Sequence, residues 1–340
     1  MRRLTLILSD LYLPEEAAGA GDGAAPLPNL SWLLRFARAP GRVDDWRRWL
    51  LRRLDLPELS DVAVADIAAR AFLDPGRDAA TWLATPVRLS ARLDHVRLET
   101  RGLLRLEADE AAAFCAEFAT QFAPHFQLHA AGERNFLLTG LEPRSARTVD
   151  PARLLGADIG GALPDGGAAP LLRRLGAEIE MWLHASELNV TRERAGKPRI
   201  STLWLWGGGG GRRVALPRLS PQVPMTRLHG TDAFLHGLAA MTRMAAPTPA
   251  PVNLDQDASV EHRVIELTPM SGEPRDSLDN LDANTLAAAR HALEAGALTA
   301  VDIVVNDRCF HVTPRARWKV WRRRRGWLEN LARPAVSAQV

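Results

Sequence analysis

The chain has 340 residues, of which 46% are hydrophobic and 24% are charged, and its formal net charge is +3. This length and apolar content suffice for one large core or two moderate ones, and no apolar stretch is long enough to cross a bilayer. The two cysteines, Cys115 and Cys309, provide no disulfide framework, so we expect a protein of the reducing cytoplasm and not a disulfide-stabilised secreted one.

The positive charge is concentrated near the C-terminus. Seven cationic residues and no acidic residue lie between positions 315 and 325, namely Arg315, Arg317, Lys319, Arg322, Arg323, Arg324 and Arg325. The seven positive charges of this stretch exceed the net charge of +3, so the other residues together carry a small negative charge. The charge pattern therefore predicts an acidic body with one basic tail.

The N-terminal run Arg3–Leu8 is short and rich in β-favouring residues, and Ser9-Asp10 interrupts it before any signal-peptide cleavage site. It is predicted to be a buried strand. The Ala/Gly/Pro-rich stretch 15–28 is predicted to be a loop, and the apolar spacing between Trp32 and Leu73 is typical of amphipathic helices.

The next part of the chain alternates between the hydrophobic periodicity of strands and that of helices. Strands are predicted at 81–89 and 96–100, a helix at 107–122, and a short hairpin at 126–129 and 135–139. Pro170 opens the clearest helix, because proline suits the first helical turn. A strongly β-prone run, 200–206, is followed at once by the five glycines 207–211.

The C-terminal part continues the alternation of helices and strands. Helices are predicted at 232–244 and 282–294, strands at 263–268, 301–305 and 308–313, and a final basic helix at 315–331. Strands separated by helices favour an α/β sheet with parallel stretches. The sequence suggests three regions, an N-terminal α/β region at 1–150, a central segment at 151–245 and a C-terminal α/β region at 246–340.

The segment from Leu183 to Gly209 has the most distinctive pattern. Its marked positions are His184, Asn189, Arg192, Arg194, Gly196-Lys197-Pro198, and a strand with a glycine turn, Ser201–Gly209. It resembles the "H-P-x-N-x-x-R … G-x-x-P-x-N … G-x-G" segment of archaeal-type cofactor-independent phosphoglycerate mutases. It is still more similar to the bacterial "regulatory protein, RpfE type" relatives, whose version ends in a "LWLWGGG"-like turn.

Flanking stretches extend this resemblance. Gly230-Thr231, Gly237 and Met241 resemble the mutases' next segment, and residues 150–164 fit a "G-x-D-x-x-x-x-L-P" stretch of the related proteins. Overall the resemblance covers roughly residues 80–245. It implies a reduced α/β fold with a sheet derived from the alkaline-phosphatase-like mutases and flanked by helices.

The resemblance also implies which residues an active enzyme needs. The mutases use a metal pair to activate a serine or threonine that carries the phosphoryl group. Asp10 stands where the first metal ligand is expected, and Asp307 and His311 form an Asp-x-x-x-His pair near the right neighbourhood. No Asp-His dipeptide follows the family segment, and no convincing nucleophile is present. We therefore expect no metal site and a catalytically degenerate relative. An active phosphoglycerate mutase or phosphotransferase using manganese or magnesium is the alternative, with Asp10, Asp307 and His311 as the suspected residues.

The same segment supplies candidate ligand contacts. Cations and glycine amides hold phosphate and carboxylate groups by charge-assisted hydrogen bonds. The candidates are His184, Asn189, Arg192, Arg194, Lys197, Gly207, Gly208, Gly209 and Arg212. The expected partner is a phosphorylated or otherwise anionic small molecule, or another protein. Cations near a helix C-terminus and glycines in a turn also occur without any ligand.

The basic tail allows one further alternative, since its arginines could bind nucleic acid or another anionic surface through residues 315–325. No nucleic-acid-binding motif accompanies it. The alternative reading is a terminal helix that packs on the body through its tryptophans and leaves a solvated basic face.

Overall fold

The computed structural model describes residues 2–11, 26–74, 80–210, 225–249, 259–270, 277–305, 307–315, 322–323 and 325–331. The chain divides into two compact units. Unit 1 contains Met1–Asp55, Leu219–Gly230 and Pro247–Val340, and unit 2 contains Leu56–Arg218 and Thr231–Ala246. This division differs from the three consecutive regions suggested by the sequence, because strands from both ends of the chain pair in one sheet.

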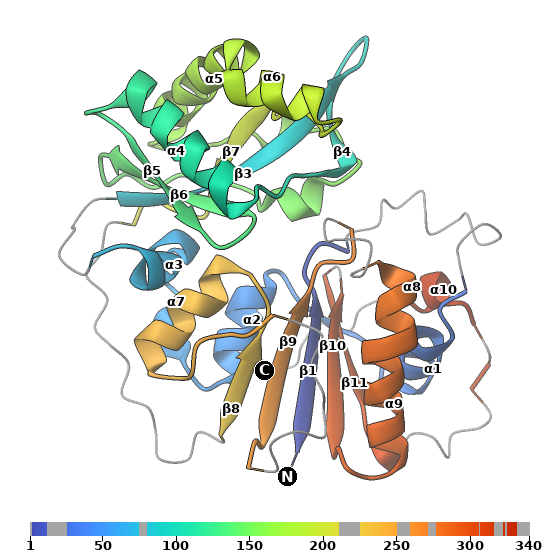
Figure 1. The fold of residues 1–340 in the computed structure, drawn as a ribbon. Coiled ribbons are helices and arrows are strands. Elements are labelled where there is room, and N and C mark those ends of the chain that lie inside the picture. Colours follow the sequence, from blue (N-terminus) through green and yellow to red (C-terminus); the bar gives the residue numbers. More distant parts are fainter. Residues whose placement is uncertain are drawn as a thin grey trace. The chain divides into compact units, whose positions relative to one another are not determined.

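Unit 1 is built on a six-stranded sheet with the order β2-β11-β10-β1-β9-β8 (Figure 1). The strands are β1 (Arg3–Leu8), β2 (Gly41–Arg42), β8 (Thr226–His229), β9 (His262–Leu267), β10 (Ala300–Val305) and β11 (Arg308–Val312). The four strands β8, β9, β1 and β10 run parallel to one another, whereas β11 is antiparallel to both of its neighbours, β10 and β2. The almost continuous burial of β1, rich in leucine, and of β10, rich in valine and isoleucine, is typical of parallel strands covered on both faces.

One face of this sheet is covered by helices around an apolar core. The helical elements are α1 (Pro28–Phe36), α8 (Leu278–Leu281), the π-helical turn η6 (Asp282–Leu286), α9 (Ala287–Glu294) and α10 (Trp327–Leu331). The Asp282 carboxylate caps α1 by accepting from the backbone nitrogens of Asn29 (3.1 Å) and Leu30 (2.7 Å). The N-cap of the short helix α2 (Trp46–Arg53) is Asp45, whose side chain accepts a hydrogen bond from Arg47 N.

Unit 2 contains the second sheet, in which β4, β3, β6 and β5 are neighbours in that order and β7 also pairs with β3. The strands are β3 (Ala80–Ala91), β4 (Val96–Leu103), β5 (Gln127–Ala131), β6 (Asn135–Leu141) and β7 (Thr202–Trp206). All of these pairs are antiparallel. Because β3 is 12 residues long, it pairs with β6 near its start, with β7 in its middle and with β4 near its end.

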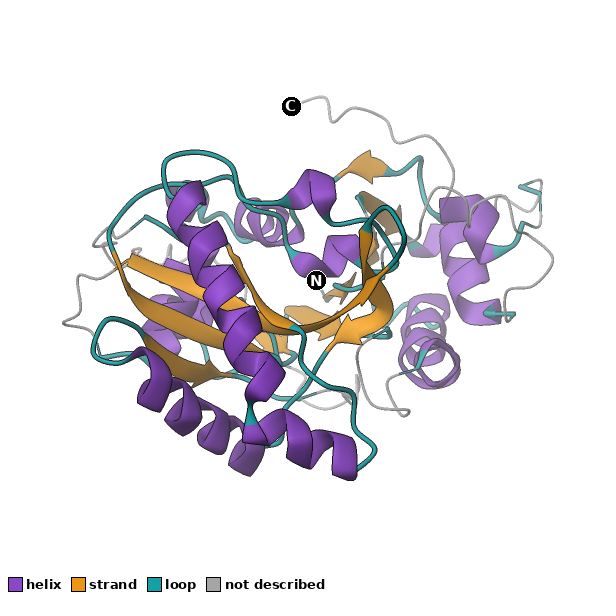
Figure 2. Ribbon diagram, turned by 90° about the horizontal axis from the view of Figure 1, so that it is seen from above, coloured by secondary structure: helices purple, strands orange, loops and turns teal. Residues whose placement is uncertain are grey.

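The helices of unit 2 are α3 (Val64–Phe72), α4 (Ala108–Phe122), α5 (Ala169–Ala185), α6 (Glu187–Arg194) and α7 (Ala233–Thr242), with short 3₁₀ turns at η2 (Pro57–Leu59), η3 (Pro151–Leu154) and η4 (Gly160–Ala162). Figure 2 looks down on the helices (purple) and strands (orange). Trp182 of α5 packs against Phe114, Phe118 and Phe122 of α4, which joins both helices to the core of this sheet. Helix α3 packs on α7.

The mixed α/β class with flanking helices is confirmed, and most predicted elements lie within a few residues of their predicted bounds. Two differences stand out. The four-residue strand β8 has no sequence signal of its own and forms by pairing with β9. Within the described residues, the basic helix predicted at 315–331 is α-helical only at Trp327–Leu331, and Arg315 lies in a 3₁₀ turn. Residues 316–321 and 324 lie outside the described residues, as do residues 15–25 of the loop predicted at 15–28.

Among the residues that the structure describes, no helix combines the length and the apolar character that crossing a bilayer requires.

Candidate functional site

Unit 2 contains a cavity of about 600 Å³ at the junction of α5, α6 and the start of β7. Three of the sequence-predicted ligand contacts line it, His184, Asn189 and Lys197. Two further cations, Arg88 of β3 and Arg199, line the same cavity. The distinctive segment thus folds around one concave site, the kind of place where small ligands bind.

Asn189 builds the wall of this cavity. Its Nδ2 donates to the carbonyl oxygens of Leu183 (2.8 Å) and Ile200 (2.9 Å), and its Oδ1 accepts from Ile200 N (2.8 Å). These bonds tie the end of α5 to the residue that enters the strand β7. The buried amide of Asn189 therefore fixes the loop around the cavity, and a direct ligand contact by this residue remains a prediction.

Arg192 forms a buried ion pair. Its Nη1 contacts Glu110 Oε1 of α4, and its Nε donates to the Pro198 carbonyl (2.7 Å). Its side chain is 4% exposed and that of Glu110 13%. Arg194, on the same helix, is exposed and does not line the cavity. The structure therefore separates the two arginines, which the sequence places together.

The cations that do line the cavity are partly neutralised by carboxylates. Lys197 Nζ lies 3.4 Å from Glu110 Oε2, Arg199 Nη1 lies 3.2 Å from Glu193 Oε2, and Arg88 Nε lies 2.9 Å from Glu99 Oε1. The Lys197 side chain is 47% exposed, so its ammonium group can also reach a ligand.

Arg199 is held in place by its Nη2, which donates to the His184 carbonyl at the end of α5 (2.9 Å). It follows the Gly196-Lys197-Pro198 motif directly and was missed only because the motif ends one residue earlier. No sequence pattern indicated Arg88, because only the pairing of β3 with the strand β7 brings this residue to the cavity. A hydrogen bond from Leu89 N to Ser201 Oγ (3.0 Å) extends that pairing.

The predicted glycine contacts lie at the other end of β7 and do not line this cavity. Gly207 has a φ of +66°, and its nitrogen donates to Thr148 Oγ1 (3.0 Å). A Cβ atom on Gly208 would overlap the Thr81 carbonyl oxygen, and one on Gly209 the carbonyl oxygen of Arg144. Close backbone packing thus accounts for these glycines without a ligand. Arg212 lies outside the described residues.

The three suspected catalytic residues lie in unit 1 and do not form one group. Asp10 and Asp307 both follow the carboxyl ends of adjacent parallel strands, β1 and β10. Asp10 Oδ1 accepts from Met270 N (3.2 Å), and Asp307 Oδ1 lies 2.7 Å from Arg308 Nη1. His311 lies back from that edge, opposite Asp302, and its Nδ1 is 2.5 Å from Asp302 Oδ1.

These positions do not supply the ligands of a metal pair. Within the described ranges, no three His, Cys, Asp or Glu side chains gather in a way that could hold a metal ion. Asp10, Asp307 and His311 therefore do not fit the pair of ions that the resemblance implies, since a hard divalent cation needs several converging oxygen ligands.

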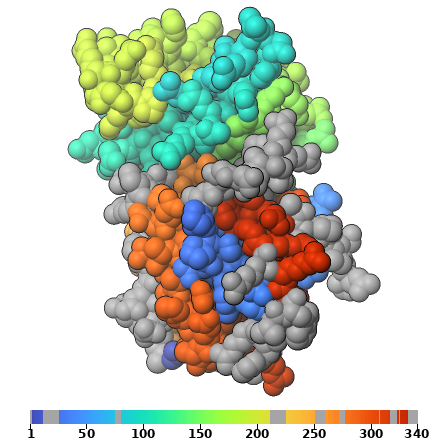
Figure 3. All heavy atoms as spheres, turned by 90° about the vertical axis from the view of Figure 1, so that its right-hand side faces the viewer, coloured from blue at the N-terminus to red at the C-terminus, as the bar shows by residue number. Residues whose placement is uncertain are grey.

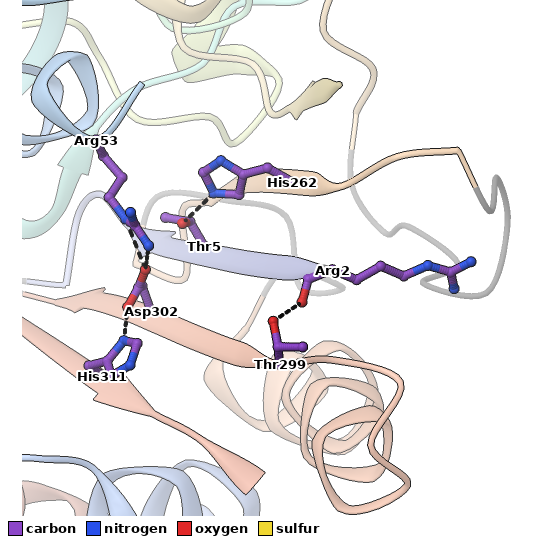
Figure 4. A network of polar contacts seen from close by, with 7 residues as sticks. All are labelled: Arg2, Thr5, Arg53, His262, Thr299, Asp302 and His311. Atoms are coloured by element: carbon purple, nitrogen blue, oxygen red, sulfur yellow. Dashed lines mark hydrogen bonds and ion pairs between the residues drawn. The ribbon is translucent and has the colours of Figure 1, made fainter. Parts of the chain in front are cut away.

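A polar network lies on the sheet of unit 1 (Figure 4). Arg53 Nη2 and Nε lie 3.0 and 3.2 Å from Asp302 Oδ2, and His311 bonds the other carboxylate oxygen. Burial alone would raise the pKa of Asp302, but the hydrogen bond from His311 and the charge of Arg53 outweigh it and lower that pKa. Nearby, His262 Nε2 is hydrogen-bonded to Thr5 Oγ1 (2.9 Å).

This network predicts an acid-sensitive fold. Burial, followed by the charge of Arg53, lowers the pKa of His262 to about 4, with Asp302 opposing and Arg3 adding to the shift. The unfolded chain binds a proton at this histidine near pH 6.5, so its contribution is present above that pH and is lost as the pH falls towards 4. We expect His262 to account for about 2–3 kcal/mol of the stability lost between pH 7.5 and 4.5.

Urea unfolding of the wild type and of His262→Gln at both pH values measures this contribution. The glutamine variant should lose less stability on acidification than the wild type. Equal losses in the two proteins would contradict the prediction.

The residues of the basic tail differ in their contacts with the rest of unit 1. Arg322 Nη1 donates to the carbonyl oxygens of Arg35 (3.0 Å) and Ala37 at the end of α1, while Arg35 Nε donates to the Arg322 carbonyl (2.9 Å). Figure 3 shows α1 (blue) beside the C-terminal residues (red), and Trp327 is part of the core. Arg315, Arg323 and Arg325 are exposed, and Arg317, Lys319 and Arg324 lie outside the described residues. Arg322 and Trp327 therefore dock this segment on unit 1.

No protein-family model and no curated protein matches the chain. Among solved structures, it is similar to the cofactor-independent phosphoglycerate mutase from Thermoplasma acidophilum, with 14% identity, 92% of this chain and 90% of that chain covered, and a TM-score of 0.39. It is also similar to the PH0037 protein from Pyrococcus horikoshii, with 13% identity, 92% and 87% coverage and a TM-score of 0.46. Similarity this distant assigns neither a family nor an activity.

Proposed function

We propose that this chain is a phosphoglycerate mutase-like protein of the RpfE type that has lost the metal-dependent reaction. It binds a small phosphorylated or carboxylated ligand in the cavity between α5, α6 and β7. The observation that carries the proposal is that the segment with the family resemblance, between His184 and Ser201, lines one cavity of about 600 Å³. Lys197, Arg199 and Arg88 contribute cationic groups to its wall.

The charges of the cavity favour an anion. Three cations and two carboxylates, Glu180 and Glu193, line it. Burial raises the pKa of Glu180, against a hydrogen bond with Thr202 that lowers it, so this carboxylate takes up a proton more readily than usual. Among the lining side chains cations outnumber carboxylates, while Glu99 and Glu110, which do not line the cavity, pair with Arg88 and Lys197. The guanidinium groups suit the oxygens of a phosphate or a carboxylate.

The loss of the reaction is supported by the arrangement of the suspected residues. His311 is bonded to Asp302, and the described residues contain no group of three His, Cys, Asp or Glu side chains that could hold a metal ion. None of the ligand-binding residues proposed here belongs to that edge of unit 1.

Calorimetric titration with 3-phosphoglycerate and inorganic phosphate tests the binding. The double variant Lys197→Met/Arg199→Met should bind at least tenfold more weakly than the wild type, since each charge-assisted hydrogen bond contributes about 1.5–3 kcal/mol. Arg194→Met is the matched control, because Arg194 is exposed on α6 and does not line the cavity. Unchanged affinity in the double variant would contradict the proposed site.

A mutase assay with added manganese or magnesium tests the loss of activity. No interconversion of 2- and 3-phosphoglycerate is expected. Turnover that disappears in the alanine variants of Asp10, Asp307 and His311 would instead establish the active metal-dependent enzyme.

A further inference from the structure

A second cavity adjoins the first in unit 2. Its volume is about 290 Å³, and it shares Leu89 and Glu180 with the larger cavity. Its other walls come from the segment 159–164, from α5 and from the strand β7, and they are mainly apolar, as with Ile159, Leu163 and Leu203. A cationic cavity and an apolar cavity therefore meet at one boundary.

The apolar cavity is open to water. Leu163 at its wall is 47% exposed, which leaves apolar surface hydrated in the free protein. Covering such surface is favourable, at about 25 cal/mol for each Å² of apolar area removed from water. A ligand with an apolar part gains this energy here, whereas a purely polar ligand does not.

Gly176 keeps this cavity open. It lies inside α5 and lines the cavity, and a Cβ atom built on it would meet nothing within 4 Å. Glycine inside a helix is about 1 kcal/mol less favourable than alanine, and no close packing requires it at this position. The free space beside Gly176 is the space that an apolar chain would fill.

We infer that the ligand of this site is an amphipathic anion, a phosphate or carboxylate head joined to a short unbranched apolar chain. The head lies in the larger cavity near Lys197 and Arg199, and the chain lies beside Gly176 between α5 and β7. This inference rests on the proposed function, because it takes the same cationic site and adds the class of ligand. Glu180 lies where the two parts meet, and its hydrogen bond with Thr202 holds the carboxyl group at the boundary.

Three probes separate the two parts of the ligand: octyl phosphate below its micellar concentration, inorganic phosphate, and octanol. Calorimetry with the full chain should give an affinity for octyl phosphate at least tenfold above those for phosphate and for octanol. Gly176→Leu, which fills the apolar cavity, should remove the advantage of the octyl chain and leave phosphate binding unchanged. Lys197→Met should weaken the binding of both phosphates.

Two matched variants control for the added leucine. Arg174→Leu places a leucine on the exposed side of the same helix and should leave all affinities unchanged, because the Arg174 side chain is 80% exposed and lines neither cavity. Ala177→Leu fills the same cavity from the next residue and replaces Gly176→Leu as the test if that variant does not fold.

Each contrary result has its own meaning. Equal affinities for octyl phosphate and phosphate, or an octyl advantage that survives both cavity-filling variants, would overturn the amphipathic ligand and leave the anion site standing. Octanol binding as tightly as octyl phosphate would show that the head is not recognised, which overturns the inference. Failure of every anion to bind would overturn the proposed function as well.

Discussion

Replacing Gly237 with alanine is expected to lower the free energy of unfolding of unit 2 by about 3 kcal/mol, because the added methyl group has no room. Gly237 lies in α7 where this helix crosses α3. A Cβ atom there would overlap the Ile67 carbonyl and lie 2.7 Å from Ala68 Cα. These are backbone atoms of α3, so no side-chain rotation can relieve the overlap, and the helices must move apart.

Urea unfolding followed by circular dichroism measures this effect, with Gly176→Ala as the matched control. Both glycines are inside helices, but a methyl group on Gly176 meets open space. The control should therefore be stabilised by about 1 kcal/mol through helix propensity alone. A Gly237→Ala variant as stable as the wild type would mean that the two helices do not pack as closely as described.

Arg192→Ala should destabilise unit 2 by about 3 kcal/mol, since removing this partner leaves the buried carboxylate of Glu110 with only the half-exposed ammonium of Lys197, 3.4 Å away. The Arg192 side chain is 4% exposed and that of Glu110 13%, so water cannot replace the lost partner readily. The Pro198 carbonyl also loses its donor. The same variant should loosen the loop that carries Lys197, which Arg192 holds through that carbonyl.

Thermal and urea unfolding compare Arg192→Ala with Arg194→Ala, which removes an exposed arginine from the same helix and should change stability by less than about 0.5 kcal/mol. The double variant Glu110→Gln/Arg192→Met should recover part of the loss, because it removes the buried charge together with its partner. If Arg192→Ala and Arg194→Ala are equally stable, the buried ion pair contributes nothing to this fold.

The sequence predicted the elements whose signals are local. Helix α5 begins at Ala169 and has the predicted Pro170 in its first turn, and α4 lies within the helix predicted at 107–122. The apolar run of β1 and the hairpin of β5 and β6 were predicted in the same way. Each of these signals depends only on neighbours within a few residues.

The candidate site was predicted in part. Its segment was recognised, and Lys197 and His184 do line a cavity. The sequence did not distinguish the roles of residues of the same type: Arg192 is buried against Glu110, whereas Arg199 faces the cavity and was not singled out. The partner of an arginine lies far away in the chain, so residue type and spacing cannot reveal it.

By itself, the sequence determined the α/β class, the bounds of most helices and strands, and the segment that forms the cavity. Only the tertiary structure decided that the cavity forms before the start of β7, away from the glycines that follow this strand, and that Arg88 joins the site from β3. It also decided that β1 pairs with β9 and β10, and that β8 pairs with β9, which makes both units discontinuous in the chain. The reason is physical: helix and strand formation follow local hydrophobic periodicity, whereas strand order and side-chain partners depend on which distant surfaces bury one another.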